Sequence, residues 1–293
     1  MTQSDHSTFL PFLLEIGSEE IPARFIPDSM AELERLSAEA FENAHLECGG
    51  LRVMATPRRL ALLVEKMSSR QPDREVELKG PPVSVAFDDQ GQPTPAGEGF
   101  ARKAGVSLAD CGRGSDKRGE YLVARKVEPG RPAAEVLTEI MPGIILGLPF
   151  RKVMRWGDHD LEYPRPLQWL VALLGTDVVP LEVDYFTAGR VTRGHRTLAR
   201  DAEVEIADPS AYTEALRAVG VIVDHQERRT LISEGIQREL DNYHPEARLV
   251  ADGELLEEVV FLCEHPTPFL GSYSEDYFAL PREVITTALK ACL

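Results

Sequence analysis

The first 67 residues alternate between the periodicities that distinguish strands from helices. An apolar run over residues 9–16 has the length of a buried strand, and residues 17–20 break it. Asp28 is a suitable helix N-cap, and apolar side chains then recur at helical spacing until Gly49 and Gly50. Two more apolar runs, residues 51–56 and 60–67, flank Pro57. This order of strand, helix, strand and strand predicts a mixed sheet with a helix packed on one face.

Strand patterns and helix patterns both occur up to about residue 205, and only helix patterns follow. Residues 68–99 are rich in turn-forming Gly, Pro and Asp. The other expected elements are a helix at 100–104, a strand at 120–127, a helix or broken helix pair at 133–146, strands within 181–196, and helices at 208–216, 227–240, 255–263 and 281–293. The sequence therefore predicts an α+β fold, with mixed sheets and packed helices in residues 1–205 and a mainly helical region in residues 206–293.

Charge and cysteine usage limit the class of protein. The chain has 32 basic and 48 acidic residues, a net charge of −16, which repels nucleic acid unless basic side chains gather on one face. A histone-like or polybasic membrane-binding protein is excluded. The four cysteines are far apart and form no CxxC pair, which predicts buried free thiols in a reducing compartment. With no targeting pattern and no apolar run near the ~20 residues that span a bilayer, we expect a soluble, cytoplasmic protein without a membrane partner.

Standard catalytic and cofactor motifs are missing from the sequence. There is no phosphate-binding GxxxxGK[ST], no GxGxxG after a strand, no nucleophile elbow and no HExxH. The glycine-rich stretch 112–119 is expected to be a flexible loop. His159 and Asp160 form a lone HD dipeptide, and Cys263 with His265 lacks a second ligand pair. The sequence therefore predicts no catalytic residue, no metal site and no cofactor bound by this chain.

Two basic segments are the best candidates for a binding surface. Guanidinium groups suit phosphate oxygens, and aromatic rings can stack on unpaired bases. Residues 150–169 and 190–200 combine these features and supply the candidate tRNA-binding residues Lys152, Arg155, Trp156, Arg165, Arg193, His195 and Arg196. For the first segment an alternative is equally open, in which Trp156 and Trp169 are core residues and the arginines pair with nearby acids. For the second, Gly194 favours close approach of a ligand to the backbone.

Short strings along nearly the whole chain, residues 9–290, resemble the β subunits of bacterial heterotetrameric glycyl-tRNA synthetase in their N-terminal part. The strings occur in the family's order: LLEIGSEEIP from residue 13, TPRRLA from 56, KGPP from 79, GFAR from 99, GEYL from 119, MRWG from 154, RPLQWLV from 165, TRGHR from 192 and LPREV from 280. Each string alone is weak, but their shared order is specific. After Lys290 the family usually continues with His-Gln or Asn-Gln, whereas this chain reads Ala291, Cys292, Leu293.

The resemblance implies a class II synthetase built from two α and two β subunits. In that family the α subunit carries the active site, which activates glycine with ATP and Mg²⁺, and the β subunit supplies tRNA-binding parts. The N-terminal region of the β subunit is similar to the B3/B4 domain of the phenylalanyl enzyme, with a degenerate HD-type domain also present. Anticodon binding belongs to a far C-terminal portion. The implied partners are the α subunit and tRNA(Gly).

Three functions are therefore compared. In the first, the chain is a non-catalytic part of the β subunit that contributes to tRNA binding and subunit assembly. In the second, by analogy with the B3/B4 domain, it hydrolyses mischarged tRNA, although fold analogy is a weak argument and glycine's small site needs little editing. In the third, the arginines pair internally and the chain is purely a structural scaffold.

Overall fold

The computed structural model describes residues 8–88, 90–117 and 119–291. The chain divides into two compact units. One is Arg70–Pro132, and the other combines the chain up to Ser69 with the chain from Ala133 onward. The predicted boundary between residues 205 and 206 does not coincide with this division, and it stays a prediction.

The larger unit is built on a five-stranded antiparallel sheet in the order β10-β9-β1-β3-β2. The strands are β1 (Phe9–Ser18), β2 (Cys48–Thr56), β3 (Arg59–Ser68), β9 (Leu167–Leu174) and β10 (Asp177–Val178). The central strand β1 is buried continuously from Phe12 to Ser18. A strand covered on both faces reads as an unbroken apolar run, which is why the sequence signal was clear. The strands predicted at 9–16, 51–56 and 60–67 are confirmed.

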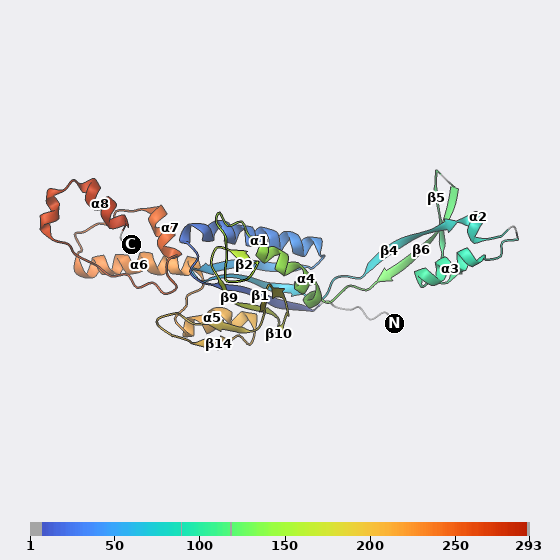
Figure 1. The fold of residues 1–293 in the computed structure, drawn as a ribbon, viewed down its shortest axis with the longest axis horizontal. Coiled ribbons are helices and arrows are strands. Elements are labelled where there is room, and N and C mark those ends of the chain that lie inside the picture. The colour runs from blue at the N-terminus through green and yellow to red at the C-terminus, as the bar shows by residue number, and fades with distance from the viewer. Residues whose placement is uncertain (1–7, 89, 118, 292–293) are drawn as a thin grey trace. The chain divides into compact units, whose positions relative to one another are not determined.

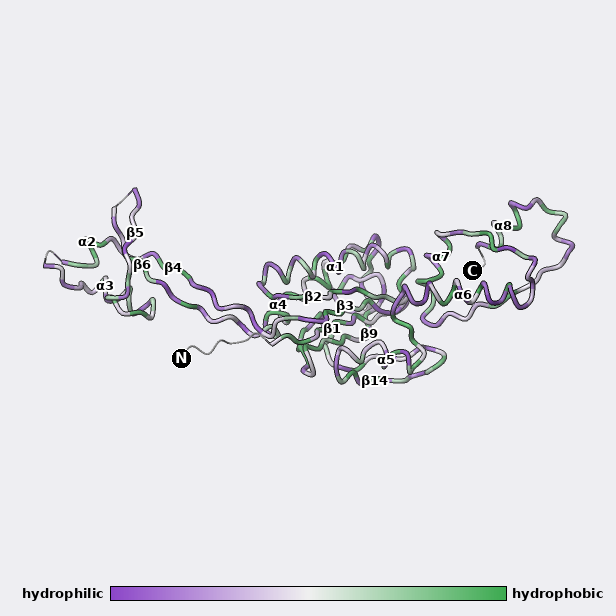
Figure 2. The backbone as a smooth tube through the Cα atoms, turned by 180° about the vertical axis from the view of Figure 1, so that it is seen from behind, coloured by the Kyte–Doolittle hydropathy of each residue, from purple (hydrophilic) through white to green (hydrophobic). Residues whose placement is uncertain are grey.

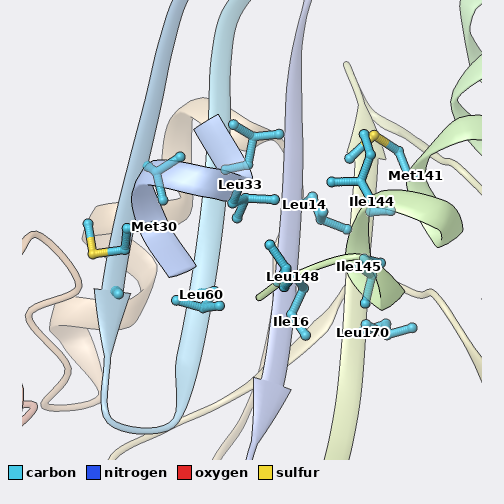
Figure 3. Close-up of a cluster of buried hydrophobic side chains, with 14 of the residues drawn as sticks. Leu14, Ile16, Met30, Leu33, Leu60, Met141, Ile144, Ile145, Leu148 and Leu170 are labelled. Carbon is cyan, nitrogen blue, oxygen red and sulfur yellow. The ribbon is translucent and has the colours of Figure 1, made fainter. Parts of the chain in front are cut away.

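Helices α1 (Ile26–Asn43) and α4 (Ala133–Leu146) cover one face of this sheet. Figure 3 shows Met30 and Leu33 of α1, and Met141, Ile144 and Ile145 of α4, gathered over sheet residues such as Leu14 and Leu60. The prediction that Asp28 caps α1 is wrong, because α1 begins at Ile26 after the 3-10 helix η1 (Ala23–Phe25). Asp28 instead lies in the first turn, where a carboxylate favours the helix dipole. Residues 133–146 form one helix that accommodates Pro142.

The opposite face is covered by the segment around α5 (Tyr212–Ala218), so the sheet lies between α1 and α4 on one face and this segment on the other (Figure 1). Because side chains alternate along a strand, Leu13 of β1 packs on this side while Phe12 and Leu14 pack toward α1. Short strands complete this part of the unit: β7 (Met154–Arg155), β8 (Glu162–Tyr163), β11 (Glu182–Val183), β12 (Phe186–Thr187), β13 (Val191–Arg193) and β14 (Glu203–Glu205), with the 3-10 helix η3 (Pro209–Ala211) before α5. The predicted strands within 181–196 are therefore present, but brief.

The chain after α5 is helical. It contains α6 (His225–Tyr243), α7 (Gly253–Val260), the 3-10 helix η4 (Glu275–Ala279) and α8 (Arg282–Ala291). Asp224 caps α6 by accepting hydrogen bonds from the backbone of Gln226 and Glu227. The fully buried Arg228 ties α6 to its surroundings by donating to the carbonyl groups of Ala55 at 2.7 Å and Val260 at 3.0 Å, among others. Burial lowers the pKa of Arg228 to about 10.

The smaller unit, Arg70–Pro132, is a three-stranded antiparallel sheet with two helices. Its elements are β4 (Arg74–Pro82), α2 (Val83–Ala86), α3 (Pro95–Ala104), the 3-10 helix η2 (Leu108–Asp110), β5 (Gly112–Asp116) and β6 (Gly119–Glu128). The paired strands β4 and β6 carry largely hydrophilic residues (Figure 2). Residues 112–116 form a strand, so the predicted loop is wrong there, and β4 occupies part of the stretch that was expected to form turns.

The α+β fold class is confirmed. No helix in the described ranges is long and apolar enough to cross a membrane. Cys48, Cys111 and Cys263 are free, as predicted, but each is only half-buried. Cys292 lies outside the described residues.

Candidate functional site

The centre of the larger unit contains a buried carboxylate, Glu15 on β1. Its side chain is fully buried among leucines, yet its oxygens are well supplied with donors. The indole Nε1 of Trp169, the hydroxyl of Thr192 and the hydroxyl of Tyr212 all donate hydrogen bonds to it. These donors come from β9, β13 and α5. Glu15 therefore links three elements that are far apart in the sequence.

Arg59, at the start of β3, supplies the positive charge for this region. Its Nη1 lies 3.7 Å from Glu15 Oε2, and its Nη2 lies 3.1 Å from Glu264 Oε1. It also donates to the Arg193 carbonyl oxygen at 3.0 Å. Burial alone would lower the pKa of Arg59, but the carboxylates of Glu264 and Glu15 outweigh it and raise that pKa above its usual value. The guanidinium therefore stays charged in the interior.

We call the connected side chains the buried ionic cluster: Glu15, Thr56, Arg59, Thr192, Tyr212 and Glu264. Thr56 joins it by donating its hydroxyl to Glu264 Oε1 at 2.7 Å. Removing one partner of a buried ion pair leaves the other charge uncompensated, at a cost of roughly 3–5 kcal/mol. All six side chains are at least 95% buried, since Glu264 is the most exposed at 5%. The cluster therefore fixes the positions of the surrounding strands and loops, and it does not itself face a ligand.

Trp169 lies between this cluster and the surface. Its indole packs directly on the backbone of Gly17, where an added Cβ would lie only 2.0 Å from the ring. Three guanidinium carbons lie near the ring centroid: Arg193 at 5.1 Å, and Arg58 and Arg59 at 5.5 Å each. The face of an aromatic ring attracts such cations. Trp169 thus holds two arginines, Arg58 and Arg193, in defined positions beside the surface.

A pocket of about 530 Å³ opens on this side of the molecule. We call it the arginine pocket. Its charged lining consists of Arg58, Arg193, Arg196 and Arg200 together with Glu19, Asp201 and Glu203. A second hollow of about 300 Å³ shares Arg193 and Glu203 with it and reaches Trp169 and Gln168. Four arginines therefore meet at one surface of a chain whose net charge is −16.

The predicted residues of the second basic segment divide between this pocket and internal contacts. Arg193 lines the pocket and makes one long hydrogen bond, 3.4 Å, to Gln168 Oε1. Arg196 also lines it but forms ion pairs with Glu19 and, at 3.1 Å, with Glu20. A glycine at 194 is explained by packing, because a Cβ there would lie 3.1 Å from the Cβ atoms of Ala202 and Val219.

His195 has a role within the turn that follows β13. Its Nδ1 accepts hydrogen bonds from the backbone N–H groups of Thr197 and Leu198, both at 3.1 Å. An imidazole that accepts at Nδ1 carries its proton on Nε2 and is neutral. Burial lowers the pKa of His195, and the positive charges of Arg58 and Arg59 lower it further. The neutral ring therefore shapes the segment that carries Arg196 and Arg200.

The candidate residues of the first basic segment, 150–169, do not line the arginine pocket. Lys152 is exposed, and Arg155 on β7 pairs with Asp160 at 3.3 Å and Glu162 at 3.4 Å. Trp156 is half-buried and donates to the Tyr163 carbonyl at 3.0 Å. Arg165 donates to the Glu20 carbonyl at 3.0 Å, beside the carboxylate that pairs with Arg196. Within this segment, the alternative of internal pairing describes Arg155, and Trp169 is a core residue, as that alternative also expected.

Sequence reasoning missed several residues of this region: Glu15, Arg58, Arg59 and Glu264. Arg200 lies within the predicted segment 190–200 but was not among the named candidates. A signal was available for Glu15, which interrupts a run of leucines and can remain there only with buried donors. Another signal was available in the adjacent arginines Arg58 and Arg59, which directly precede the apolar run of residues 60–67. Four of the strings that carry the family resemblance, starting at residues 13, 56, 165 and 192, meet at the buried ionic cluster and the arginine pocket.

No group of three His, Cys, Asp or Glu side chains in the described ranges is arranged to hold a metal ion. His159 lies 3.4 Å from Asp184, and Cys263 points its thiol at the Val259 carbonyl.

Comparison with known proteins gives one consistent result. The family model described as glycyl-tRNA synthetase beta subunit matches residues 12–292. A protein of Geobacter metallireducens named glycine--tRNA ligase beta subunit is 42% identical over 280 residues, which are 95% of this chain and 40% of that protein. Proteins of the same name from Syntrophotalea carbinolica and Myxococcus xanthus are 42% and 41% identical over 94% and 95% of this chain. The chain spans about 40% of the length of these curated relatives.

Proposed function

Because the chain belongs to the glycyl-tRNA synthetase beta subunit family, we propose that it is a non-catalytic, tRNA-binding and assembly part of glycine–tRNA ligase. In this proposal the reaction partner is an α subunit, which binds ATP, Mg²⁺ and glycine within an α2β2 assembly. The substrate contacted by this chain is tRNA(Gly). The cytoplasm, predicted from cysteine usage, is its proposed location.

The observation that carries the tRNA-binding role is the arginine pocket. A strongly acidic chain repels RNA unless its cations are concentrated at one place, and here four arginines line one pocket. Guanidinium forks form charge-assisted hydrogen bonds with phosphate oxygens. The guanidinium of Arg193 is held in position, because it lies over the ring of Trp169 and this ring donates a hydrogen bond to Glu15 of the buried ionic cluster.

The assembly role is supported differently. Arg196 and Arg155 are already engaged with Glu19, Glu20, Asp160 and Glu162. By themselves, these internal ion pairs fit the purely structural alternative. Exposed ion pairs contribute only about 0–1 kcal/mol each to stability, so these arginines and acids can exchange their present partners for charged groups of another subunit. This is the support for the assembly role.

A charge reversal of Arg193 and Arg196 in the complete α–β assembly tests the tRNA-binding role. We expect Arg193→Glu with Arg196→Glu to raise the KM for tRNA at least tenfold, because two phosphate-binding cations become repulsive. Glycyl-adenylate formation, measured by ATP–pyrophosphate exchange, should change less than twofold.

The matched control reverses Arg35 and Arg238, which are exposed on α1 and α6 and do not line the pocket. This pair changes the net charge equally and should leave the KM for tRNA unchanged. An equal loss of adenylate formation and of tRNA charging in the pocket variant would refute the proposed role. So would an equal increase of the KM in the control.

A further inference from the structure

We propose that the arginine pocket contains a subsite for one phosphate group, bound by Arg58, Arg193 and Arg200. The inference rests on the proposed function for the source of that phosphate, which we take to be an internucleotide phosphodiester of bound RNA. The site itself is defined by side chains of this chain alone.

Arg58 is the central observation. It is only 7% exposed, and it lines the pocket. Its buried Nε has no hydrogen-bond partner, and its guanidinium forms no ion pair with any described residue. Buried polar groups are nearly always satisfied, so an unsatisfied buried cation needs an explanation. The Nε itself is fully enclosed, but the two Nη groups donate to no described residue and are not enclosed, so an anionic ligand in the pocket can accept their hydrogen bonds.

The other buried arginines show that this fold normally satisfies such groups. Arg59 contacts two carboxylates, a hydroxyl and a carbonyl oxygen. Arg228 donates to four backbone carbonyl groups. Arg58 alone among these three is left with free donors that face a cavity. The contrast separates a structural arginine from one that is held ready for a ligand.

The charges around Arg58 also favour an anion. Burial lowers its pKa, and Arg196 and Arg59 lower it further, while Glu264 and Glu19 act in the opposite direction. Both of those carboxylates are already engaged, Glu264 with Arg59 and Glu19 with Arg196. Two cations and two acids therefore act on Arg58, and both of those acids already pair with another arginine.

Two further donors complete the subsite. Arg193 presents its guanidinium over Trp169 and makes one long hydrogen bond, and Arg200 is exposed with no ion pair to a described residue. The acids Asp201 and Glu203 also line the pocket, but both are exposed and have no fixed partner among these arginines. A tetrahedral phosphate can accept hydrogen bonds from three guanidiniums that approach from different directions. The planar oxygens of a carboxylate suit one fork.

Trp169 provides a direct measurement of occupancy. The sequence has two tryptophans, so Trp156→Phe leaves Trp169 as the sole indole. Its ring lies 5.1 Å from the guanidinium of Arg193 and 5.5 Å from that of Arg58, so movement of either cation changes its surroundings. In this variant, inorganic phosphate is titrated at constant ionic strength by replacing chloride. We expect a saturable change in Trp169 fluorescence.

Two pocket variants and one control make the titration specific. Arg200→Gln, at an exposed position that does not endanger folding, should weaken phosphate binding at least fivefold. Arg58→Met, which keeps the bulk of the buried side chain, should weaken it at least tenfold. Arg35→Gln on α1 should have no effect. A fluorescence change that is linear and unsaturable, or an affinity unchanged by Arg200→Gln, would overturn the subsite.

The source of the phosphate is tested with a short oligoribonucleotide that lacks terminal phosphates. It should produce the same Trp169 response and should compete with inorganic phosphate. A response only to an oligonucleotide with a terminal phosphate would overturn the phosphodiester assignment. If tRNA binds tightly while phosphate leaves Trp169 unchanged, the subsite is wrong and the proposed function stands. If phosphate binds and tRNA does not, the proposed function fails and the anion site stands.

Discussion

A single carboxylate organises the interior of the larger unit. Glu15 is held by three donors from three elements and lies 3.7 Å from Arg59. The indole that donates to it, Trp169, can occupy its position only because residue 17 has no side chain. Gly17 therefore matters for the close approach of a ring, in the strand that also carries Glu15.

Replacing Gly17 tests this packing. In Gly17→Ala the new methyl group would lie 2.0 Å from the indole, so the ring must move and its hydrogen bond to Glu15 must break. Overpacking of a core costs typically 1–3 kcal/mol, and we expect a loss of about 3 kcal/mol here because the bond is lost as well. Urea denaturation followed by circular dichroism measures it. Gly49→Ala in β2, where a Cβ meets nothing within 4 Å, is the control and should change stability by less than about 0.5 kcal/mol. Similar losses in both variants would contradict the assigned packing.

At the residue scale, the sequence predicted some members of the site and not others. Arg193 and Arg196 stood out because they are clustered with a glycine and few nearby acids. Arg59 could not be identified as buried, since its partner Glu264 lies 205 residues away and only the folded chain brings them together. Arg58 was missed for a related reason, because the ring that it packs against, Trp169, is distant in the sequence.

Among the elements, the turn after β13 is the one whose shape depends on a titratable group. The neutral ring of His195 accepts from two backbone N–H groups and so closes the segment that presents Arg196 and Arg200. Protonation of Nδ1 would replace this acceptor with a donor. The conformation of the pocket wall is therefore linked to pH.

The sign of this linkage follows from the lowered pKa of His195. Above the ordinary value of 6.5 the imidazole is neutral in both states, and its contribution to stability is fully present. As the pH falls below 6.5, the unfolded chain binds the proton more readily, so this contribution is lost. We expect a lower urea midpoint at about pH 5.5 than at about pH 7.5.

His195→Asn isolates the effect, because an amide oxygen can accept the same hydrogen bonds and does not titrate. His225, whose pKa is also lowered, remains in both proteins. The difference in urea midpoint between the two pH values should therefore be smaller in the variant, though not zero. An identical pH dependence in both proteins would exclude His195 as the titrating group.

Elements with strong local patterns were predicted well, and those defined by pairing were not. The leucine-rich strands β1 and β3 and helix α6 were evident from periodicity. Strand β4 was missed because its glycine and prolines indicate turns, and only its pairing with β6 makes it a strand. Helix α1 begins before its apparent cap because the 3-10 turn of residues 23–25 leads directly into it.

For the whole molecule, the order of strand and helix patterns predicted the α+β class but could not reveal the compact unit Arg70–Pro132, which interrupts the larger one. Its entry and exit lie together, since the backbone of Ala133 donates to the carbonyl of Ser69 at 2.9 Å. Contacts of this kind depend on the chain returning after the 63 residues of Arg70–Pro132, and local sequence patterns do not predict them. The net charge of −16 likewise concealed a pocket lined by four arginines.

The salt dependence of tRNA binding by the 293-residue chain tests the central claim most directly. Each contacted phosphate contributes about −0.7 to −0.9 to the slope of log K against log salt concentration. We predict a clear negative slope, and a slope shallower by about 0.7 to 0.9 in Arg193→Gln with Arg200→Gln, because both arginines bind the same phosphate. The paired control Arg35→Gln with Arg238→Gln should keep the slope of the unmodified chain. An affinity that does not change with salt, or a slope that is the same in all three proteins, would contradict binding of RNA phosphates in the arginine pocket.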